Sequence, residues 1–450
     1  MAQQKSFIKE FLLNIDWGLV ISMALLLAIG FASIASVTGA AGLSAKYLPV
    51  QGSAVIVGFF LMLILAGFNY QHYLELDKWV YILSLLLLGS VLIFGVTVRG
   101  TRGWFNFGVA SFQAVELAKI MYILVISSFL TKTVKELKKP IFIVYAFLLL
   151  LGHLGLIMMQ PDFSSTLSYF PVTIVLLYLA GVEWFYILCI VVFGAIATGI
   201  PLMMTFFSAK GITISSSIIV KILYASQTPL GWGYLIIALL LALFFIWFLC
   251  RKLRIRVSML FPLILSVSIV AGCIGSIGVE KALKDYQRRR LIVFLDPTID
   301  QRGSGYNIIQ SKISVGSGKI LGKGFRRGSQ TRLGFLPEQH TDFIFSTVGE
   351  EGGWVFSQGV ILIYFFFLWR ALAIARNAKD SYGSFVAVGI ATMFAFYAFI
   401  NIGMVMGMMP VAGMPLLLLS YGGSSIVSSM CAVGILCSIS IRRHTHHRQY

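Results

Sequence analysis

The chain contains 450 residues, of which 58% are hydrophobic and only 12% are charged. Apolar runs of about 20 residues recur along it, as in helices that cross a bilayer core roughly 30 Å thick, so the composition excludes a soluble globular protein. The net charge of +18 does not indicate a nucleic-acid partner, because the Lys and Arg residues lie between apolar runs.

We therefore predict an all-α polytopic membrane protein, with residues 1–450 as one integral membrane domain. Backbone groups in lipid must be hydrogen-bonded within the protein, and these runs are too long and too uniformly apolar for barrel strands. Twelve spans are predicted. Their ranges are 17–37, 48–68, 79–98, 112–130, 141–159, 166–180, 184–206, 231–250, 257–279, 354–373, 385–408 and 415–441.

The distribution of Lys and Arg predicts which ends of the spans face the cytoplasm. Clusters of these residues follow the fourth, eighth, tenth and last spans, as expected if both termini are cytoplasmic. The clusters are Lys132, Lys135, Lys138 and Lys139; Arg251, Lys252, Arg254 and Arg256; Arg370, Arg376 and Lys379; and Arg442, Arg443 and Arg448. The long polar stretch 280–353 then becomes a large extracytoplasmic loop.

That loop contains most of the residues suited to polar chemistry. Its Arg and Lys side chains favour a multiply charged anion at the outer membrane face, and the alternative is a rim that contacts solvent or lipid headgroups. These residues are Arg288, Arg289, Arg290, Arg302, Lys312, Lys319, Lys323, Arg326, Arg327 and Arg332. Asp296 and Asp300 lie among them and should stay ionised, because nearby cations lower a carboxyl pKa. Either is then able to act as a general base or to hold a divalent cation.

The glycines of the loop do not form a nucleotide-binding motif. A Walker loop needs a glycine five residues before its Gly-Lys pair, and Ile313 occupies that position before Gly318-Lys319. We interpret the glycines as turns and close contacts, or as free backbone N–H groups for an anion.

Three smaller groups of polar residues are open to two interpretations each. Glu116 and Lys119 share one helical face and form either an ion pair or part of a site. Asp162, after Pro161, is either a helix cap or a cavity-facing carboxylate. His340 is either a structural hydrogen-bonding residue or a metal ligand together with Glu338 or Asp342.

Five stretches together resemble the SEDS family (shape, elongation, division and sporulation), also called the FtsW/RodA/SpoVE family. In chain order they are GTRGWFNFGVASFQAVELAK, QPDFSS, FLDPTIDQRGSGYNIIQSKISVGSGKILGKGF, FLPEQHTDFIFSTVGEEGG and PVAGMPLLLLSYGGSS. They span nearly the whole chain, and the HTDFIF and SYGGSS blocks are highly specific. The form GSQTRLGFLPEQHTDFIF is most similar to the RodA branch.

The resemblance implies a peptidoglycan glycosyltransferase that polymerises lipid II, the undecaprenyl diphosphate-linked disaccharide pentapeptide. The reaction takes place at the outer face of the bacterial cytoplasmic membrane during elongation. A class B penicillin-binding protein, acting as transpeptidase, the elongation machinery and membrane lipids are the implied partners. The resemblance implies no organic cofactor, and a divalent cation, Mg2+ or Mn2+, is a candidate.

The matching motifs also imply functional residues. Asp300, just before the G-x-G-Y motif at 303–306, matches the catalytic aspartate and is the candidate metal ligand. The implied substrate-binding residues are Arg102, Glu116, Lys119, Gln160, Asp162, Arg302, Gln310, Ser311, Lys312, Glu338, His340 and Asp342.

The sequence departs from the family pattern in a few places. Gln301 replaces the usual Pro after the catalytic Asp, Asn307 replaces a Gln, and Ser164-Ser165 replaces Gly-Thr. These changes put the shape of the loop in doubt more than its chemistry. The family's core has about ten helices, and residues 207–256 add to this core. We therefore predict that they are an insertion with an extra helix pair.

A single inverting displacement converts the α-linked diphosphate donor into a β-1,4 linkage. The reaction needs a base for the acceptor hydroxyl but no acid for the diphosphate leaving group, so one aspartate suffices. The alternatives are a transporter or flippase of a lipid-linked sugar, which predicts ionisable residues near helix midpoints, and a scaffold with dispensable loop charges.

Overall fold

The computed structural model describes residues 13–40, 42–98, 100–108, 111–136, 139–211, 218–226, 228–253, 260–282, 288, 290, 293–294, 296 and 303–443. The chain divides into two compact units. The larger one combines Met1–Gly181 with Asn307–Tyr450, and the smaller one is Val182–Tyr306.

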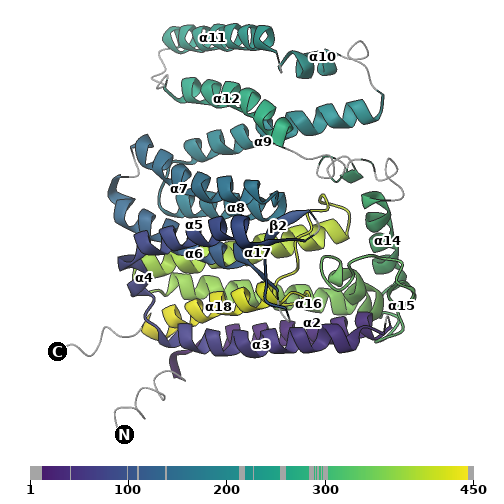
Figure 1. Ribbon diagram of the computed structural model, residues 1–450. Coiled ribbons are helices and arrows are strands. Elements are labelled where there is room, and N and C mark those ends of the chain that lie inside the picture. Colours follow the sequence, from purple (N-terminus) through teal and green to yellow (C-terminus); the bar gives the residue numbers. More distant parts are fainter. Residues whose placement is uncertain are drawn as a thin grey trace, which may run out of the picture. The chain divides into compact units, whose positions relative to one another are not determined.

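The larger unit is a bundle of long helices that lie side by side (Figure 1). Its helices are α2 (Trp17–Ala40), α3 (Ser44–Gly67), α4 (Gln71–Glu75), α5 (Asp77–Phe94), α6 (Ala114–Thr133), α7 (Pro140–Met159), α8 (Phe163–Leu179), α15 (Ser329–Leu333), α16 (Ile344–Arg376), α17 (Ser381–Val405) and α18 (Gly423–Ile441), with a short 3-10 helix at Val134–Glu136.

The centre of this bundle is formed by α6, α17 and α18, which are the spans with the largest buried share. Small residues allow close packing there, as expected for helices that associate within lipid. A Cβ atom at Gly434 of α18 would lie 2.6 Å from the Met62 carbonyl oxygen of α3, so only glycine permits this approach. The outer helices α3, α5 and α7 expose large apolar side chains instead.

The smaller unit contains α9 (Trp184–Ala209), α10 (Ile218–Ala225), α11 (Pro229–Lys252) and α12 (Leu260–Ala282). Close packing between α9 and α12 is again made possible by a glycine, since a Cβ at Gly272 would lie 2.9 Å from the Ile196 Cβ. None of the apolar window of α11 is buried. The predicted insertion at 207–256 includes α10 and α11, and its origin as an insertion stays a prediction. The remaining helix α14 (Ser304–Ser317) runs from the end of this unit into the larger one.

The predicted all-α membrane fold is confirmed. Eleven helices of the described residues are long and apolar enough to cross a membrane, and the sixth predicted span, α8, is shorter, with 17 residues. Every predicted span falls on a helix, but two of the starting points were wrong. Helix α16 begins at Ile344 instead of Trp354, with non-helical backbone at Gly353 (φ 70°), and α18 begins at Gly423 instead of Pro415.

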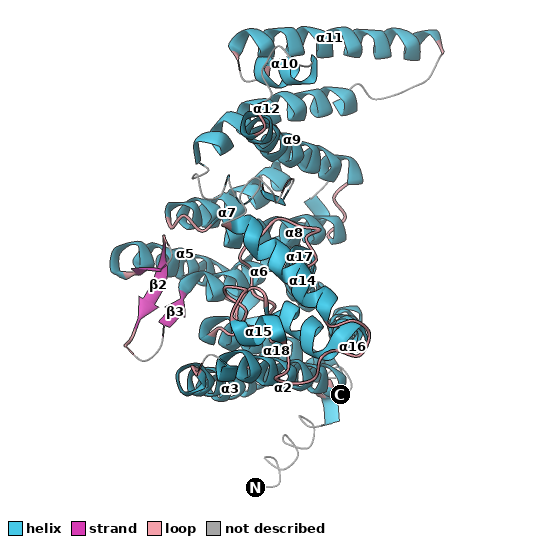
Figure 2. Ribbon diagram, turned by 90° about the vertical axis from the view of Figure 1, so that its right-hand side faces the viewer, coloured by secondary structure: helices cyan, strands magenta, loops and turns pink. Residues whose placement is uncertain are grey.

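A small antiparallel sheet, which the sequence analysis missed, precedes α6. Its strands are β1 (Val96–Val98), β2 (Thr101–Asn106) and β3 (Ser111–Gln113), in the order β1-β2-β3. The apolar residues of β1 continue the pattern of α5, so that hydropathy alone assigned them to a helix. Figure 2 shows β2 and β3 at the same end of the larger unit as α15.

Candidate functional site

The predicted site residues of the larger unit lie on or next to elements at one end of its bundle, the end that Figure 2 shows. This end contains the sheet, α15 and the starts of α6, α8, α16 and α18. The segments 334–343 and 406–422 connect these elements there. The arrangement brings together motifs that lie more than 200 residues apart in the chain, because Gln113 of β3 hydrogen-bonds Ser424 of α18.

Glu116 and Lys119 form a buried ion pair on the first turns of α6. The Lys119 Nζ atom lies 2.9 Å from Glu116 Oε1, and both side chains are at most 6% exposed. Lys119 also donates to the Tyr397 hydroxyl of α17, and its ammonium lies 4.3 Å from the centroid of that ring. A charge inside a membrane helix needs such partners to offset its desolvation. The ion pair exists, and a substrate-binding role stays a prediction.

Asp162 is the N-cap of α8. Its Oδ1 atom accepts from the Ser165 backbone N–H at 3.0 Å, and its Oδ2 atom accepts from the Ser165 hydroxyl at 2.7 Å. The Gln113 amide donates to the same Oδ2 at 3.2 Å. The capping interpretation is therefore correct, and the contact with Gln113 joins the starts of α6 and α8.

Polar residues continue inward from this contact along both helices. Gln113, Glu116 and Lys119 follow one another at intervals of three, as do Asp162, Ser165 and Ser168 on α8. Such spacing keeps each series on one helical face. The two series meet at a small cavity whose lining includes Lys119, Ser168 and Tyr169. The buried Tyr169 hydroxyl has no hydrogen-bond partner among the described residues.

Arg102 and Gln160 connect the sheet to the ends of α5 and α7. The Arg102 guanidinium donates to the carbonyl oxygens of Gly95 (3.1 Å) and Ile93 (3.0 Å), where α5 leaves its last carbonyls unpaired. The Arg102 backbone N–H donates to the Gln160 carbonyl at 3.2 Å. Gln160 is fully buried, and its Oε1 atom has no partner within the described part of the chain.

The three predicted residues of α14 differ in their surroundings. Ser311 is fully buried and structural, since its hydroxyl donates to the Val405 carbonyl at 2.8 Å and lies 2.8 Å from the Ser346 hydroxyl. Lys312 is exposed, and a Cβ atom at Gly407 would lie 2.5 Å from its Nζ. Gln310 has a buried Oε1 atom with no partner among the described residues.

Glu338, His340 and Asp342 lie on one turn before α16. Glu338 has a left-handed backbone (φ 57°) and accepts from the Thr341 hydroxyl at 3.1 Å. The His340 ring lies 4.7 Å from the Tyr47 ring, measured between centroids, and Asn401 donates to the Asp342 carbonyl at 2.8 Å. In the described ranges no three His, Cys, Asp or Glu side chains are placed to hold a metal ion. Metal ligation by His340 together with Glu338 or Asp342 stays a prediction.

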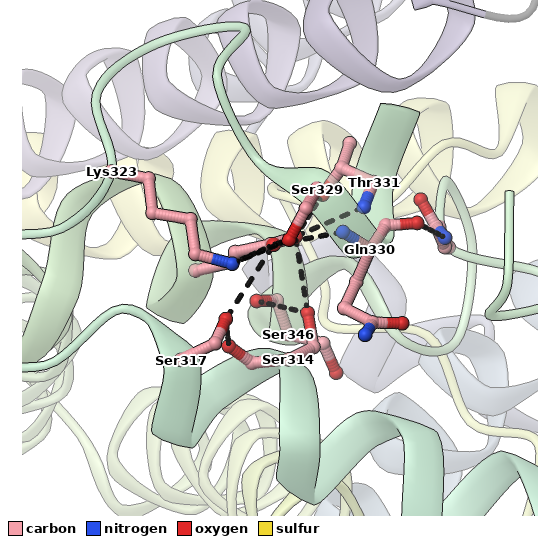
Figure 3. Close-up of polar contacts among 9 residues, drawn as sticks. Ser314, Ser317, Lys323, Ser329, Gln330, Thr331 and Ser346 are labelled. Atoms are coloured by element: carbon pink, nitrogen blue, oxygen red, sulfur yellow. Dashed lines mark hydrogen bonds and ion pairs between the residues drawn. The ribbon is translucent and has the colours of Figure 1, made fainter. Parts of the chain in front are cut away.

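Sequence analysis missed Glu350, a fully buried carboxylate that holds the loop before it. It forms an ion pair with Lys323 (2.7 Å) and accepts from the Gln330 and Thr331 backbone N–H groups at 2.9 Å each. Figure 3 shows Lys323, Ser329, Gln330 and Thr331 converging on this point. The sequence signal for such a carboxylate was an acidic residue between two apolar helical segments, in the stretch STVGEEGG.

Glu351 was missed in the same way. Its Oε1 atom accepts from the Ser36 hydroxyl of α2 at 2.5 Å, and its backbone carbonyl accepts from the Gly324 N–H at 2.9 Å. Adjacent carboxylates on α16 thus fix the 318–332 segment to the ends of two membrane helices.

The predicted catalytic residue Asp300, its metal-binding role and the neighbouring Arg302 lie outside the described residues. Asp296, the other acid of that stretch, belongs to the smaller unit and forms an ion pair with Lys210 at 3.0 Å. Its charge is therefore already partly compensated.

Known proteins match the chain over almost its whole length. The FtsW/RodA/SpoVE family model, described as a cell cycle protein, matches residues 12–244 and 213–445. The peptidoglycan glycosyltransferase RodA of Treponema pallidum is 34% identical, covering 96% of this chain and 98% of the relative. MrdB of Escherichia coli K12, also named a peptidoglycan glycosyltransferase, is 30% identical (95% and 93%), and a probable FtsW of Geobacter metallireducens is 31% identical (88% and 85%).

Solved structures agree. A chain from a peptidoglycan synthase complex, studied for the coordination of polymerisation and crosslinking, matches with a TM-score of 0.65 and 26% identity, covering 96% of this chain and 98% of that one. The crystal structure of the Thermus thermophilus rod shape determining protein RodA has the same fold, with a TM-score of 0.58, 22% identity and the same coverage. Sequence motifs, membrane helices and matches over both units together show that this chain belongs to the FtsW/RodA/SpoVE family.

Proposed function

We propose that the chain is a peptidoglycan glycosyltransferase that polymerises lipid II at the outer face of the cytoplasmic membrane during cell elongation. The observation that carries this proposal is the identity of 34% with a RodA over nearly the full length of both chains. The RodA-like sequence of residues 328–345 favours a role in elongation over one in division, although FtsW relatives also match.

The proposed chemistry is one inverting displacement. The acceptor 4-hydroxyl oxygen attacks the anomeric carbon of the donor sugar, the bond from that carbon to the diphosphate oxygen breaks, and the polyprenyl diphosphate leaves as an anion. Asp300 accepts the hydroxyl proton as general base. No carboxylic acid is needed for the leaving group, in contrast to glycoside hydrolysis.

Charge on the diphosphate requires stabilisation by cations. Lys312 is suited to this role because it is exposed and forms no ion pair within the described part of the chain. Arg302 is the second candidate, next to Asp300 in the sequence. Mg2+ or Mn2+, if bound at Asp300, would neutralise the same charge.

The buried polar series on α6 and α8 supports a binding site that reaches below the surface. Gln160 offers an unpaired buried acceptor, and an unpaired polar atom in such a place is costly unless a ligand or water satisfies it. We assign Gln160, Glu116, Lys119 and Asp162 to the surroundings of the substrate. Asp162 combines this role with capping α8.

A class B penicillin-binding protein is the proposed partner. Support comes from the similar chain in a complex whose description couples polymerisation with crosslinking. A transpeptidase needs newly made strands as substrate, so physical association of the two activities is chemically reasonable.

The decisive experiment measures strand synthesis from fluorescent lipid II by the purified chain in proteoliposomes, with and without the transpeptidase. Asp300→Ala should abolish synthesis, while Asp296→Ala should retain it because that carboxylate is engaged by Lys210. Normal polymerisation by Asp300→Ala would refute the assignment. Leaflet exchange of lipid II without strand formation would instead support the transporter alternative.

A further inference from the structure

A loop of unusual composition runs from Lys319 to Phe335, at the end of the larger unit that carries α15. It contains five cations, and the whole stretch 301–337 contains no acidic residue. Lys323 is paired with Glu350. The other four cations are exposed and form no ion pair with any described residue; they are Lys319, Arg326, Arg327 and Arg332. We call this segment the basic-apolar loop.

Large apolar side chains are exposed between these cations. They are Ile320 (66% exposed), Leu321 (82%), Phe325 (56%), Leu333 (66%) and Phe335 (44%). The Arg326 guanidinium lies 5.4 Å from the centroid of the Phe325 ring, so charged and apolar groups form one surface. Water is an unfavourable environment for such a cluster of apolar groups.

Backbone hydrogen bonds fix the level of this loop relative to the membrane helices. The Trp354 N–H donates to the Lys319 carbonyl at 2.9 Å, and the Val355 N–H donates to the Ile320 carbonyl at 3.1 Å. These donors are available because the helical backbone is interrupted at Gly353. Trp354 opens the lipid-exposed part of α16, and tryptophan favours the membrane interface. Ile320 and Leu321 therefore lie beside the start of this lipid-exposed part, at the level of Trp354 and Val355.

The loop is held firmly in this place. A Cβ atom at Gly322 would lie 2.1 Å from the Glu351 carbonyl oxygen, and one at Gly318 would lie 2.0 Å from the Gly349 carbonyl oxygen. Only glycine permits both approaches, and the two carboxylates of α16 add further anchors. The close packing of this backbone therefore holds the apolar side chains on the surface.

We propose that the basic-apolar loop is a membrane anchor that binds anionic phospholipids in the adjacent leaflet. Its apolar side chains enter the acyl boundary, and its Arg and Lys side chains contact headgroup phosphates. Arg matches phosphate geometry with paired N–H donors, and apolar and basic residues together are the usual composition of interfacial anchors. The four exposed cations and the absence of acidic residues from 301–337 favour phospholipid over a protein partner, whose surface would have mixed charges.

A depth measurement tests the insertion. The full-length chain, with an environment-sensitive fluorescent amino acid at Leu321, is placed in nanodiscs of phosphatidylglycerol with a quencher near the headgroup end of the acyl chain and without any polyprenyl diphosphate. The same label at Phe356, exposed on α16 beside Trp354, gives the interfacial lipid reference, and at Glu75, exposed on α4, it gives the aqueous reference. Quenching at Leu321 close to the Phe356 value is expected. An aqueous signal at Leu321 would overturn the proposal, as would shielding that requires a second protein.

A charge measurement tests the headgroup contact. Each cation near an anionic membrane surface contributes about 1 kcal/mol. Removing two of them, in Arg326→Gln with Arg327→Gln, should therefore lower the preference for phosphatidylglycerol over phosphatidylcholine, measured from the quenching at Leu321, by about thirtyfold. Arg376→Gln with Lys379→Gln removes the same charge near the end of α16 and should leave the preference unchanged. An unchanged preference in the first variant would refute the headgroup contact. Neither result depends on glycosyltransferase activity.

Discussion

The Ser36 hydroxyl donates to the Glu351 carboxylate at 2.5 Å, which joins the end of α2 to the start of α16. Beside it, Glu350 accepts from four groups of the preceding loop at 2.9 Å or less. Neighbouring acids thus bind different elements, and the polar end of the bundle depends on both. This arrangement makes several substitutions informative.

Glu350→Ala should destabilise the protein strongly. The change removes the partner of Lys323 and leaves two backbone N–H groups of α15 unpaired, at a cost of roughly 3 kcal/mol. Thermal unfolding in detergent would show a lowered midpoint. Glu75→Ala, at an exposed site, is the matched control and should unfold like the unchanged chain. Equal midpoints for the two variants would contradict the role assigned to Glu350.

Replacing one member of the Glu116–Lys119 pair should cost more than replacing both. Lys119→Met alone leaves a buried carboxylate without its partner, which destabilises by roughly 3 to 5 kcal/mol. The double variant Glu116→Gln with Lys119→Met removes both charges and should recover much of the folded yield, measured by size-exclusion chromatography. If the recovered double variant also polymerised lipid II normally, the pair would be structural only.

Asp162 separates capping from substrate contact. Asparagine caps helices about as well as aspartate, whereas alanine loses roughly 1 kcal/mol. Asp162→Asn should therefore keep the thermal midpoint, and Asp162→Ala should lower it. Polymerisation by the stable Asn variant then reports on the carboxylate itself, and we expect it to fall. Full activity of Asp162→Asn would leave Asp162 with the capping role alone.

Gly353→Ala should disrupt the basic-apolar loop. The Gly353 backbone has φ 70°, and a Cβ atom added there would lie 2.2 Å from the Gly322 nitrogen. Strain and displacement together should lower the unfolding midpoint and increase hydrogen exchange in residues 318–332. Gly359→Ala on the same helix meets nothing within 4 Å and serves as the control. Similar exchange in both variants would show that the close contact is unimportant.

Hydropathy predicted the membrane helices well because apolar runs of this length occur mainly in membrane-spanning helices. It failed at Val96–Val98 and at the 406–422 segment, where apolar residues form a strand or an irregular connection whose hydrogen bonds come from distant parts of the chain. The Tyr421 N–H, for example, donates to the His340 carbonyl at 2.8 Å. Such pairings leave no periodic signal.

The site was predicted in part for a similar reason. Glu116 with Lys119, and the Asp162 cap, depend on neighbours three residues away, which a sequence displays directly. Tyr397 and Ser36 depend on partners hundreds of residues distant, so their contributions could not be foreseen. Resemblance to a family supplied Asp300, which spacing alone would not have distinguished from Asp296.

The interruption at Gly353 has a consequence for how this protein can vary. A continuous helix would lock the angular positions of its first turns to those of the lipid-facing residues that follow, so any rotation of one would turn the other. Here the nine residues from Ile344 to Gly352 are free of that coupling. Substitutions that reorient Trp354 and the membrane helix toward a different bilayer can therefore accumulate while Glu350 and Glu351 keep their hold on the loop.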